Sequence, residues 1–514
     1  MKVSRKKAFK VIIYGRILMI IALLAIQITI LGFAFMWLSE DLPYVYGGFT
    51  ILTAILVIYI LNKNENPSFK LAWMVLLIIS PVFGALFYLF VKFQLESKLI
   101  NYKLLKIIDE TQAHLSQDEE VINELEEVNM QVANLAKYMV NIGGYPIYKN
   151  TDIKYFSLGE EKFEEMKKQI KKAEKFIFME YFIVEESYMW NSILELLEDK
   201  VKEGVEVRFM YDGMCSLSLL PYDYPEFIKG KGIKCKMFSP IKPVLSTAQN
   251  NRDHRKILVI DGKIAFNGGI NLGDEYINRI ERFGHWKDTA VMLKGDAVKS
   301  FTLMFLQMWN INEKNHDEFE KYISVAREEQ NVEGYVMPYG DSPLDNENVG
   351  ENVYLDILAT AKKYVHIMTP YLIIDNEMMT ALTYAAKRGI DVKLILPSIP
   401  DKKSAFMLAR TYYPELMKAG VKIYEYTPGF VHAKVFTSDD EKAVVGTINL
   451  DFRSLYLHFE CATFFYNVPT ISSIEEDFQL TLTKCKQITM DDYNKLDIFY
   501  KIGGGFLKLI APLM

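Results

Sequence analysis

The same polar pattern occurs twice in this 514-residue chain, and both copies carry residue types suited to phosphate chemistry. The first copy, from residue 254, reads HRKILVIDGKIAFNGGINL, and the second, from residue 432, reads HAKVFTSDDEKAVVGTINL. Five positions agree in type and offset: His254, Lys256, Asp261, Gly268 and Asn271, then His432, Lys434, Asp439, Gly446 and Asn449. We interpret the two copies as two halves of one active site.

Each copy places an imidazole and an ammonium two residues apart, so on a strand both side chains point to the same face. Two copies facing each other would surround one volume with two imidazoles, two ammoniums and two amides. The lysines (Lys256, Lys434) and the asparagines (Asn271, Asn449) would neutralise and orient the oxygens of a phosphodiester. One histidine would attack phosphorus and the other would protonate the leaving oxygen. No set of acids, cysteines or histidines suited to Mg or Zn is evident, so we expect neither a metal nor a cofactor.

Each reactive histidine also needs an acceptor for its second ring nitrogen, which sets the tautomer and raises basicity. Two acids just ahead of apolar, strand-like runs are candidates: Asp288 in HWKDTAVML and Glu460 in LHFECATFF. Asp261 and Asp439 belong to the catalytic motif, but each stands at a strand end before a turn. For these two carboxylates we favour contacts that support the fold over direct chemistry.

The other histidines and the cysteines carry weaker signals. His285, His366 and His458 lie on the same strands but out of register with the motif, so we expect ordinary packing or surface roles for them. The four cysteines show neither a CxxC pattern nor metal-ligand spacing, and we expect them to be unpaired core residues.

The elements around the motifs also repeat, in the same order in each half. The repeated pairs of segments are 175–187 with 364–377, 198–213 with 384–398, and 232–240 with 420–428. The first pair reads as a buried strand, an aromatic turn and acidic residues that open a helix. In the other two pairs a helix or glycine turn leads into a strand. Helix and strand alternate, so we predict an α/β fold of two homologous halves with pseudo-two-fold symmetry, residues 143–330 and 331–495.

Three apolar runs open the chain, at residues 17–38, 44–61 and 71–91. The first carries no charge and is long enough to cross a hydrocarbon core of about 30 Å. We therefore predict N-terminal transmembrane helices within residues 1–91, in a multi-pass protein. Basic residues ahead of the first run favour a cytoplasmic N-terminus. Whether the third run crosses or re-enters the membrane decides which face holds the active site, and the sequence leaves both open.

Two further segments flank the halves. Residues 92–142 have helical spacing and are predicted to be a helical linker. Residues 496–514 carry apolar positions with two lysines, and could rest on a membrane surface or pack against the protein core. The net charge of −6 argues against a binder of nucleic-acid phosphates.

In these motifs the chain resembles the phospholipase D superfamily, whose hallmark is HxKxxxxD with a downstream G-[GST]-x-N. More narrowly it resembles the bacterial cardiolipin synthases. The segments that carry this narrower resemblance are NPSFKLAWMVLLIISPVFGALFYLF, EYFIVEES, HWKDTAVMLKG, TPYLIIDNEM and the second motif through NLDFRS. The departures are an extra apolar segment at the N-terminus and a glutamate, rather than an aspartate, at Glu460.

The resemblance implies a phospholipase D-like fold and a phosphatidyltransferase of the bacterial plasma membrane. Two phosphatidylglycerols would give cardiolipin and glycerol through a phosphatidyl-histidine, without metal or nucleotide. By analogy His254 is the nucleophile and His432 the acid/base, although the residues alone leave that order open. The expected partners are phosphatidylglycerol and cardiolipin in the bilayer, with no nucleic acid, and the oligomeric state is not indicated.

Two other classes of function share these features. A hydrolytic phospholipase D, a phosphatidylserine synthase or a nuclease would use the same chemistry up to the covalent intermediate. A non-catalytic membrane scaffold would be expected to lose a histidine or lysine of the motifs, yet all four are present.

Overall fold

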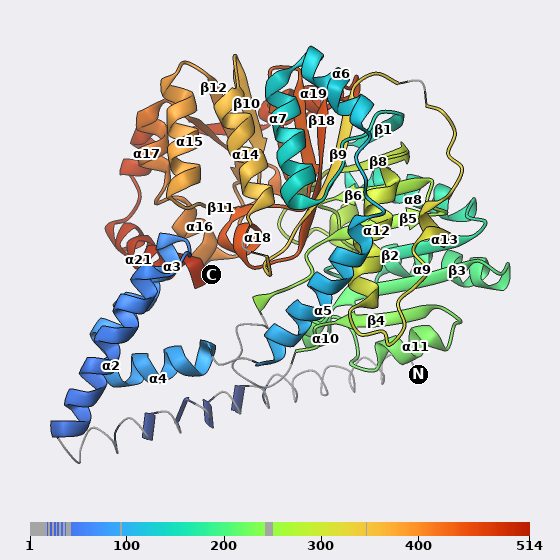
Figure 1. Cartoon of the computed structure of the whole chain (residues 1–514). Helices are drawn as coiled ribbons and strands as arrows, with labels where there is room; N and C mark the ends of the chain where they lie inside the picture. The colour runs from blue at the N-terminus through green and yellow to red at the C-terminus, as the bar shows by residue number, and fades with distance from the viewer. Residues whose placement is uncertain are drawn as a thin grey trace.

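Two α/β bodies lie against each other, with N-terminal helices extending from them (Figure 1). This computed structural model describes residues 43–92, 95–241, 250–330, 332–345 and 347–513, with scattered positions between 18 and 36.

The first body is built on a seven-stranded sheet of order β1-β8-β6-β5-β2-β3-β4. Its strands are β1 Thr151–Phe156, β2 Phe176–Tyr181, β3 Glu206–Asp212, β4 Lys234–Phe238, β5 Lys256–Ile260, β6 Ile264–Gly268 and β8 Ala290–Gly295. Its helices are α8 Gly159–Lys171, α9 Tyr188–Lys202, α10 Cys215–Ser218, α11 Tyr224–Lys229, α12 Val298–Asn310 and α13 Glu320–Ile323. β2, β3 and β4 run parallel, as expected where helices connect them, and the remaining neighbours pair antiparallel.

The second body is built on an eight-stranded sheet of order β19-β13-β12-β10-β15-β16-β18-β9. Its strands are β9 Tyr335–Asp341, β10 Tyr364–Met368, β12 Asp391–Pro397, β13 Lys422–Tyr426, β15 Val435–Ser438, β16 Lys442–Gly446, β18 Glu460–Tyr466 and β19 Cys485–Ile488. Its helices are α14 Val349–Thr360, α15 Asn376–Lys387, α16 Lys403–Ala409, α17 Tyr413–Ala419, α18 Phe452–Tyr456, α19 Thr470–Leu482 and α20 Met490–Asn494. The order β8-β6-β5-β2-β3-β4 in the first sheet matches β18-β16-β15-β10-β12-β13 in the second, which confirms the predicted α/β fold of two homologous halves.

Backbone pairing joins the two halves at their motifs. The short strand β7 (His285–Lys287) of the first half pairs in parallel with β14 (Gly429–Val431) of the second. In the reciprocal place Asp253 forms a parallel bridge with Phe459. One hydrophobic cluster also runs through both halves, with Phe178 and Ile257 from one side and Val435 and Phe465 from the other. The junction between the halves is therefore part of the core.

The N-terminal region is helical, but the run at 71–91 is not one continuous helix. That run forms two helices, α3 (Pro67–Ile79) and α4 (Pro81–Lys92), which are broken at Ser80 because Pro81 cannot continue the backbone hydrogen bonding of α3. The helices pack closely, since a Cβ on Gly84 would lie 2.9 Å from the Leu76 carbonyl oxygen.

The other two apolar runs, at 44–61 and 17–38, compare differently with the structure. Residues 44–61 fall within α2 (Pro43–Asn62), while the expected span at 17–38 lies largely outside the described residues. No helix in the described part of the chain combines the length and apolar character needed to cross a membrane.

Residues 92–142 carry α5 (Leu95–Gln112), α6 (Glu119–Val128), α7 (Met130–Tyr138) and the start of a short π-helix, η1 (Met139–Gly143). The C-terminal helix α21 (Ile498–Leu509) packs Gly504 against Thr411 and Met407, beside α16, and leaves Phe499 and Phe506 exposed. All four cysteines are free.

Candidate active site

The two motif histidines lie where the halves meet, each set by a backbone hydrogen bond to the other half. The His254 N–H donates to the carbonyl of Phe459 (2.9 Å), and the His432 N–H donates to the carbonyl of Lys287 (2.7 Å). Each acceptor residue immediately precedes an acid, Glu460 in the first case and Asp288 in the second. This pairing places each imidazole beside the carboxylate of the opposite half.

The side chains pair in the same way as the backbone. Each imidazole is hydrogen-bonded to a carboxylate of the opposite half. Nδ1 of His254 lies 2.9 Å from both carboxylate oxygens of Glu460. Nδ1 of His432 lies 2.6 Å from Oδ2 of Asp288. Both carboxylates are fully buried. In each pair Nδ1–H donates to the carboxylate, which leaves Nε2 of each ring free to react.

Burial keeps both imidazoles neutral in the free protein. It lowers the pKa of His254 to about 3 and that of His432 to about 4, despite the neighbouring carboxylates. Burial alone would raise the pKa of Glu460 and Asp288, but the hydrogen-bonded histidines hold both pKa values below their usual range. A bound phosphodiester anion would raise the pKa of both rings, because opposite charge favours the protonated form.

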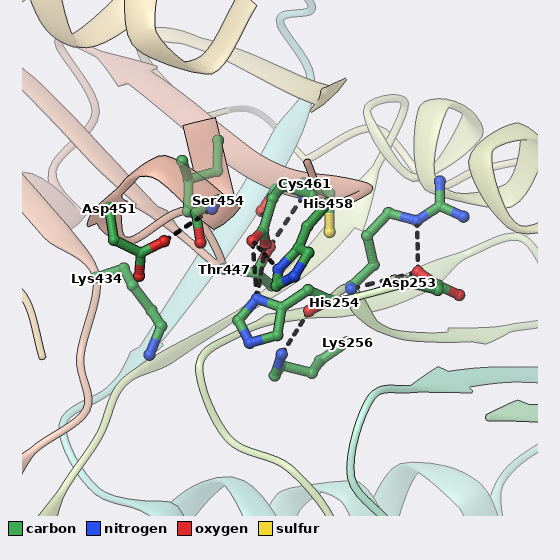
Figure 2. A network of polar contacts seen from close by, with 12 residues as sticks. Asp253, His254, Lys256, Lys434, Thr447, Asp451, Ser454, His458 and Cys461 are labelled. Carbon is green, nitrogen blue, oxygen red and sulfur yellow. Dashed lines mark hydrogen bonds and ion pairs between the residues drawn. The ribbon is translucent and has the colours of Figure 1, made fainter. Parts of the chain in front are cut away.

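The motif lysines are buried beside the imidazoles. Nζ of Lys256 donates to the carbonyl of His254, and Nζ of Lys434 donates to the carbonyl of His432. Figure 2 shows both ammonium ends approaching the His254 ring from one side, opposite to Thr447 and His458. Burial lowers the pKa of Lys256 to about 8 and that of Lys434 to about 7. Bringing an anion to this side would offset the cost of burying two ammoniums.

The glycines of the motifs allow strands to approach closely. Gly268 has φ +147°, and a Cβ there would lie 2.5 Å from the Thr289 carbonyl oxygen on the adjoining strand. At Gly446 a Cβ would meet that of Ala462 at 2.3 Å. The residue that follows differs between halves. A Cβ on Gly269 would lie 2.1 Å from Oδ1 of Asp288, whereas the Thr447 hydroxyl donates to Oε2 of Glu460.

The motif asparagines have different surroundings. Oδ1 of Asn271 accepts the Ile183 N–H at 3.0 Å, and its Nδ2 donates to the Tyr276 hydroxyl at 3.1 Å. Asn449 is also buried, but its Oδ1 has no hydrogen-bond partner. Of the two motif asparagines, Asn449 is therefore the one with an unused acceptor.

Asp261 and Asp439 contact backbone rather than the imidazoles. The Asp261 carboxylate accepts N–H groups of Glu174, Lys175 and Phe176 at 2.7–2.8 Å. The Asp439 carboxylate likewise accepts three N–H groups, at 2.7–2.9 Å, from residues 362–364. Each aspartate thus ties the turn after a motif strand to the start of the neighbouring strand.

Sequence reasoning missed one ring at this site. His458, expected to be an ordinary packing or surface histidine, lies with its ring centroid 5.5 Å from that of His254. The signal was available, because His458 stands two residues before Glu460, and alternate residues of an extended chain share a face. His285 and His366 lie elsewhere, against Tyr426 and Glu475 respectively.

One group of the described residues has the geometry to hold a metal ion. Ligand atoms of His254, His458 and Glu460 lie within 4.8 Å of one another. Two imidazoles and a carboxylate are a donor set that suits zinc. Glu460, however, is already hydrogen-bonded by His254 and Thr447, and a cation here would sit beside the ammonium of Lys256.

Comparison with known families places each motif inside its own matching region, and both regions match the same family. Residues 166–309 and 354–481 match the family described as "Cardiolipin synthase, PLD-like domain". Residues 51–92, which contain α3, α4 and most of α2, match the family described as "Phospholipase_D-nuclease N-terminal". The first match covers the two halves that carry the histidines.

Similar curated proteins extend over nearly the whole chain. An uncharacterised protein of Streptococcus mutans is 54% identical over 458 residues, covering 89% of this chain and 99% of that protein. A cardiolipin synthase of Halalkalibacterium halodurans is 33% identical and covers 92% of this chain and 95% of its own length. Cardiolipin synthase 2 of Bacillus anthracis is 34% identical, covering 91% of each chain.

Among solved structures, a phosphatidylserine synthase of Haemophilus influenzae has the same fold. It aligns with a TM-score of 0.55 over 74% of this chain and 98% of its own, at 15% identity. At that identity the likeness concerns the fold alone.

Proposed function

Because this chain belongs to the family of phospholipase D-like cardiolipin synthases, we propose that it catalyses metal-independent phosphatidyl transfer between two phosphatidylglycerol molecules. The products are cardiolipin and glycerol. The observation that carries the proposal is the pair of buried imidazoles, His254 and His432, each held through Nδ1 by a carboxylate of the opposite half. With Nε2 of both rings free, one ring can attack phosphorus while the other transfers the proton.

In the first step, Nε2 of His254 attacks the phosphorus of phosphatidylglycerol. The bound phosphodiester anion raises the pKa of His432, which takes up a proton on Nε2 from solvent. The bond from phosphorus to the glycerol head group then breaks, and His432 donates this Nε2 proton to the departing oxygen, so glycerol leaves as an alcohol. Lys256 and Lys434 stabilise the charge on the phosphate oxygens. A phosphatidyl group remains bonded to His254.

In the second step, the head-group hydroxyl of another phosphatidylglycerol gives its proton to His432 and attacks the same phosphorus. The P–N bond breaks, and cardiolipin leaves the site. One phosphodiester is exchanged for another, so no nucleotide is consumed. Assigning His254 as the nucleophile follows the family resemblance.

The described surface supports a substrate that sits in a membrane. α3, α4 and α21 enclose a cavity of about 690 Å³ with an almost wholly apolar lining that includes Trp73, Leu76 and Phe506. A cavity of about 830 Å³, lined by polar and apolar groups alike, shares Trp73 and Asn250 with it. Apolar side chains around the first cavity are exposed, including Ile79 (78%) and Phe499 (78%).

We therefore place the enzyme at the bacterial plasma membrane, with acyl chains against the apolar cavity and polar head groups beside it. Exposed apolar patches of this kind mark membrane contact or ligand grooves. A multi-pass arrangement of the N-terminal residues belongs to the same proposal.

The decisive test supplies phosphatidylglycerol as the only phospholipid to the detergent-purified protein, after dialysis against a chelator and without nucleotide. Cardiolipin and free glycerol should form in equal amounts, and His254→Ala and His432→Ala should each abolish both. Phosphatidic acid in place of cardiolipin would make water the acceptor and the protein a phospholipase. No turnover would contradict the choice of substrate.

A further inference from the structure

Each imidazole–carboxylate pair is accompanied by a second ring from the strand that supplies the carboxylate. Trp286 stands two residues before Asp288, and its ring centroid lies 5.3 Å from that of His432. His458 stands two residues before Glu460, and its ring centroid lies 5.5 Å from that of His254. The two positions correspond in the repeat, yet one holds an indole and the other an imidazole.

Both rings hold buried nitrogens without a hydrogen-bond partner: one on the Trp286 indole and two on the His458 imidazole. His458 is 8% exposed, and neither of its ring nitrogens has a hydrogen-bond partner. Its Nδ1 lies 3.8 Å from Oε1 of Glu460, just beyond hydrogen-bonding distance. The charged and titratable groups around it are Glu460 on its own strand and His254 from the first motif, with Lys256 next to that imidazole. A buried N–H without a partner is costly, so this ring gains from a short approach to the carboxylate.

Figure 2 shows which end of His254 is affected. His458 lies on the side of Thr447, away from the ammonium ends of Lys256 and Lys434. It is therefore near the Nδ1 end of His254, where Glu460 accepts, and not near the end left for phosphate. A group in this place acts on the reaction through Glu460 and His254.

On the premise of the proposed function, we propose that His458 is a positioning residue that makes the two halves inequivalent. After a short approach to the carboxylate, its N–H donates to Glu460 alongside Thr447, and together these donors keep Glu460 an ionised acceptor. An ionised Glu460 keeps the proton of His254 on Nδ1 and the lone pair on Nε2, the form in which His254 can attack phosphorus. Trp286 is the corresponding ring beside His432, the acid/base.

The charge distribution agrees with this assignment. The pKa of Glu460 lies below its usual range, although burial would raise it, because first His254 and then His458 stabilise the carboxylate. Asp288 has His432 as its main partner and receives a further N–H from the Thr289 backbone. The first half therefore satisfies its carboxylate without a second imidazole.

Three variants test the proposal, with each half as the control for the other. His458→Trp copies the first half into the second, Trp286→His makes the reciprocal change, and His458→Asn keeps an N–H donor. We expect His458→Trp to lower kcat roughly tenfold, the effect of about one hydrogen bond, with KM unchanged. His458→Asn should retain most of the wild-type kcat.

Nitrogen-15 NMR of histidine-labelled protein gives a readout that needs no turnover. Nδ1–H should be the sole tautomer of His254 in the wild type, and His458→Trp should introduce the other tautomer. Trp286→His should leave the His254 tautomer unchanged. This readout survives if phosphatidylglycerol proves not to be the substrate, so failure of the proposed function and failure of this inference are distinguishable.

Several results would overturn the inference. One is a wild-type kcat and an unaltered His254 tautomer in His458→Trp. Another is an equal loss in His458→Asn, which would make ring shape the requirement. A third is a stoichiometric, tightly bound transition metal in the wild type that His458→Trp loses, which would make His254, His458 and Glu460 a metal site.

Discussion

Nδ1 of His432, in the second half, lies 2.6 Å from Oδ2 of Asp288, in the first. The reciprocal pair, His254 with Glu460, also spans the junction. Neither motif histidine takes its carboxylate partner from its own half. The active centre is therefore a property of the junction.

Removing the charge of either carboxylate should impair the reaction. Asp288→Asn and Glu460→Gln preserve shape but no longer favour Nδ1–H on the partner ring, so we expect kcat to fall roughly a hundredfold or more with little change in KM. Steady-state assay of cardiolipin formation measures this. Glu460→Asp is the matched control, and activity in Glu460→Gln equal to the wild type would contradict the role of the pair.

Gly269 and Thr447, the residues after the two motif glycines, should respond differently to substitution. Gly269→Ala places a Cβ 2.1 Å from Oδ1 of Asp288, so the carboxylate must move from His432 and activity should be lost. Thr447→Val removes a hydroxyl donor to Glu460, and we expect kcat about tenfold lower. Thr447→Ser keeps the donor and should behave as wild type. Equal kcat in Thr447→Val and Thr447→Ser would show that the hydroxyl has no part in orienting Glu460.

The buried lysines predict a loss of substrate capture at alkaline pH. Burial lowers the pKa of Lys434 to about 7 and that of Lys256 to about 8, so each loses its charge as pH rises through these values in the free enzyme. kcat/KM, which reports the free enzyme, should fall over this range. In Lys434→Arg the cation stays charged, and the fall should move toward pH 8, where Lys256 titrates. An unchanged pH profile of kcat/KM in Lys434→Arg would show that the charge of Lys434 does not contribute to phosphate binding.

Asp439 should matter for stability rather than chemistry. Its carboxylate holds three backbone N–H groups, so Asp439→Ala should lower the free energy of unfolding by about 1–3 kcal/mol. The folded fraction should keep its kcat, measured at low temperature. Asp440→Ala, at the exposed neighbouring position, is the control for thermal unfolding. A large loss of kcat without loss of stability would instead assign Asp439 to the reaction.

The exposed face of α21 should bind lipid. Phe499→Ser and Phe506→Ser each remove a large apolar side chain worth about 1.5–3 kcal/mol when buried, so vesicle binding should weaken about tenfold or more per change. Sedimentation with phosphatidylglycerol vesicles measures the binding. Leu480→Ser, a similar change on the exposed face of α19, should leave it unaltered. If all three substitutions weakened vesicle binding equally, α21 would not be the part of the protein that contacts the lipid.

Short-range patterns in the sequence predicted much of this architecture. They did not predict the pairing of residues that lie far apart in the sequence. The repeat of strand, helix and motif predicted two α/β halves, because each half encodes its own local order. The types of Asp288 and Glu460 also identified them as acceptors. Their crossed assignment required the β7–β14 pairing and the Asp253–Phe459 bridge, which join residues far apart in sequence.

Two differences between the sequence expectations and the structure have local physical causes. The apolar composition of residues 71–91 predicted one span, but Ser80 and Pro81 break the helix and Gly84 lets the two pieces pack together. His458 was set aside because it is out of register with HxK. Its register with Glu460 was the relevant one, since both project from the same side of an extended segment.

The crossed pairs also bear on the history of the chain. A half-length ancestor with a single motif would have had no carboxylate within reach of its own histidine, so only a pair of identical copies could have assembled a working centre. In such a pair every change occurs twice. Joining the copies in one gene released them from that constraint, and the differences between Gly269 and Thr447, and between Trp286 and His458, are ones that only a fused duplicate can carry.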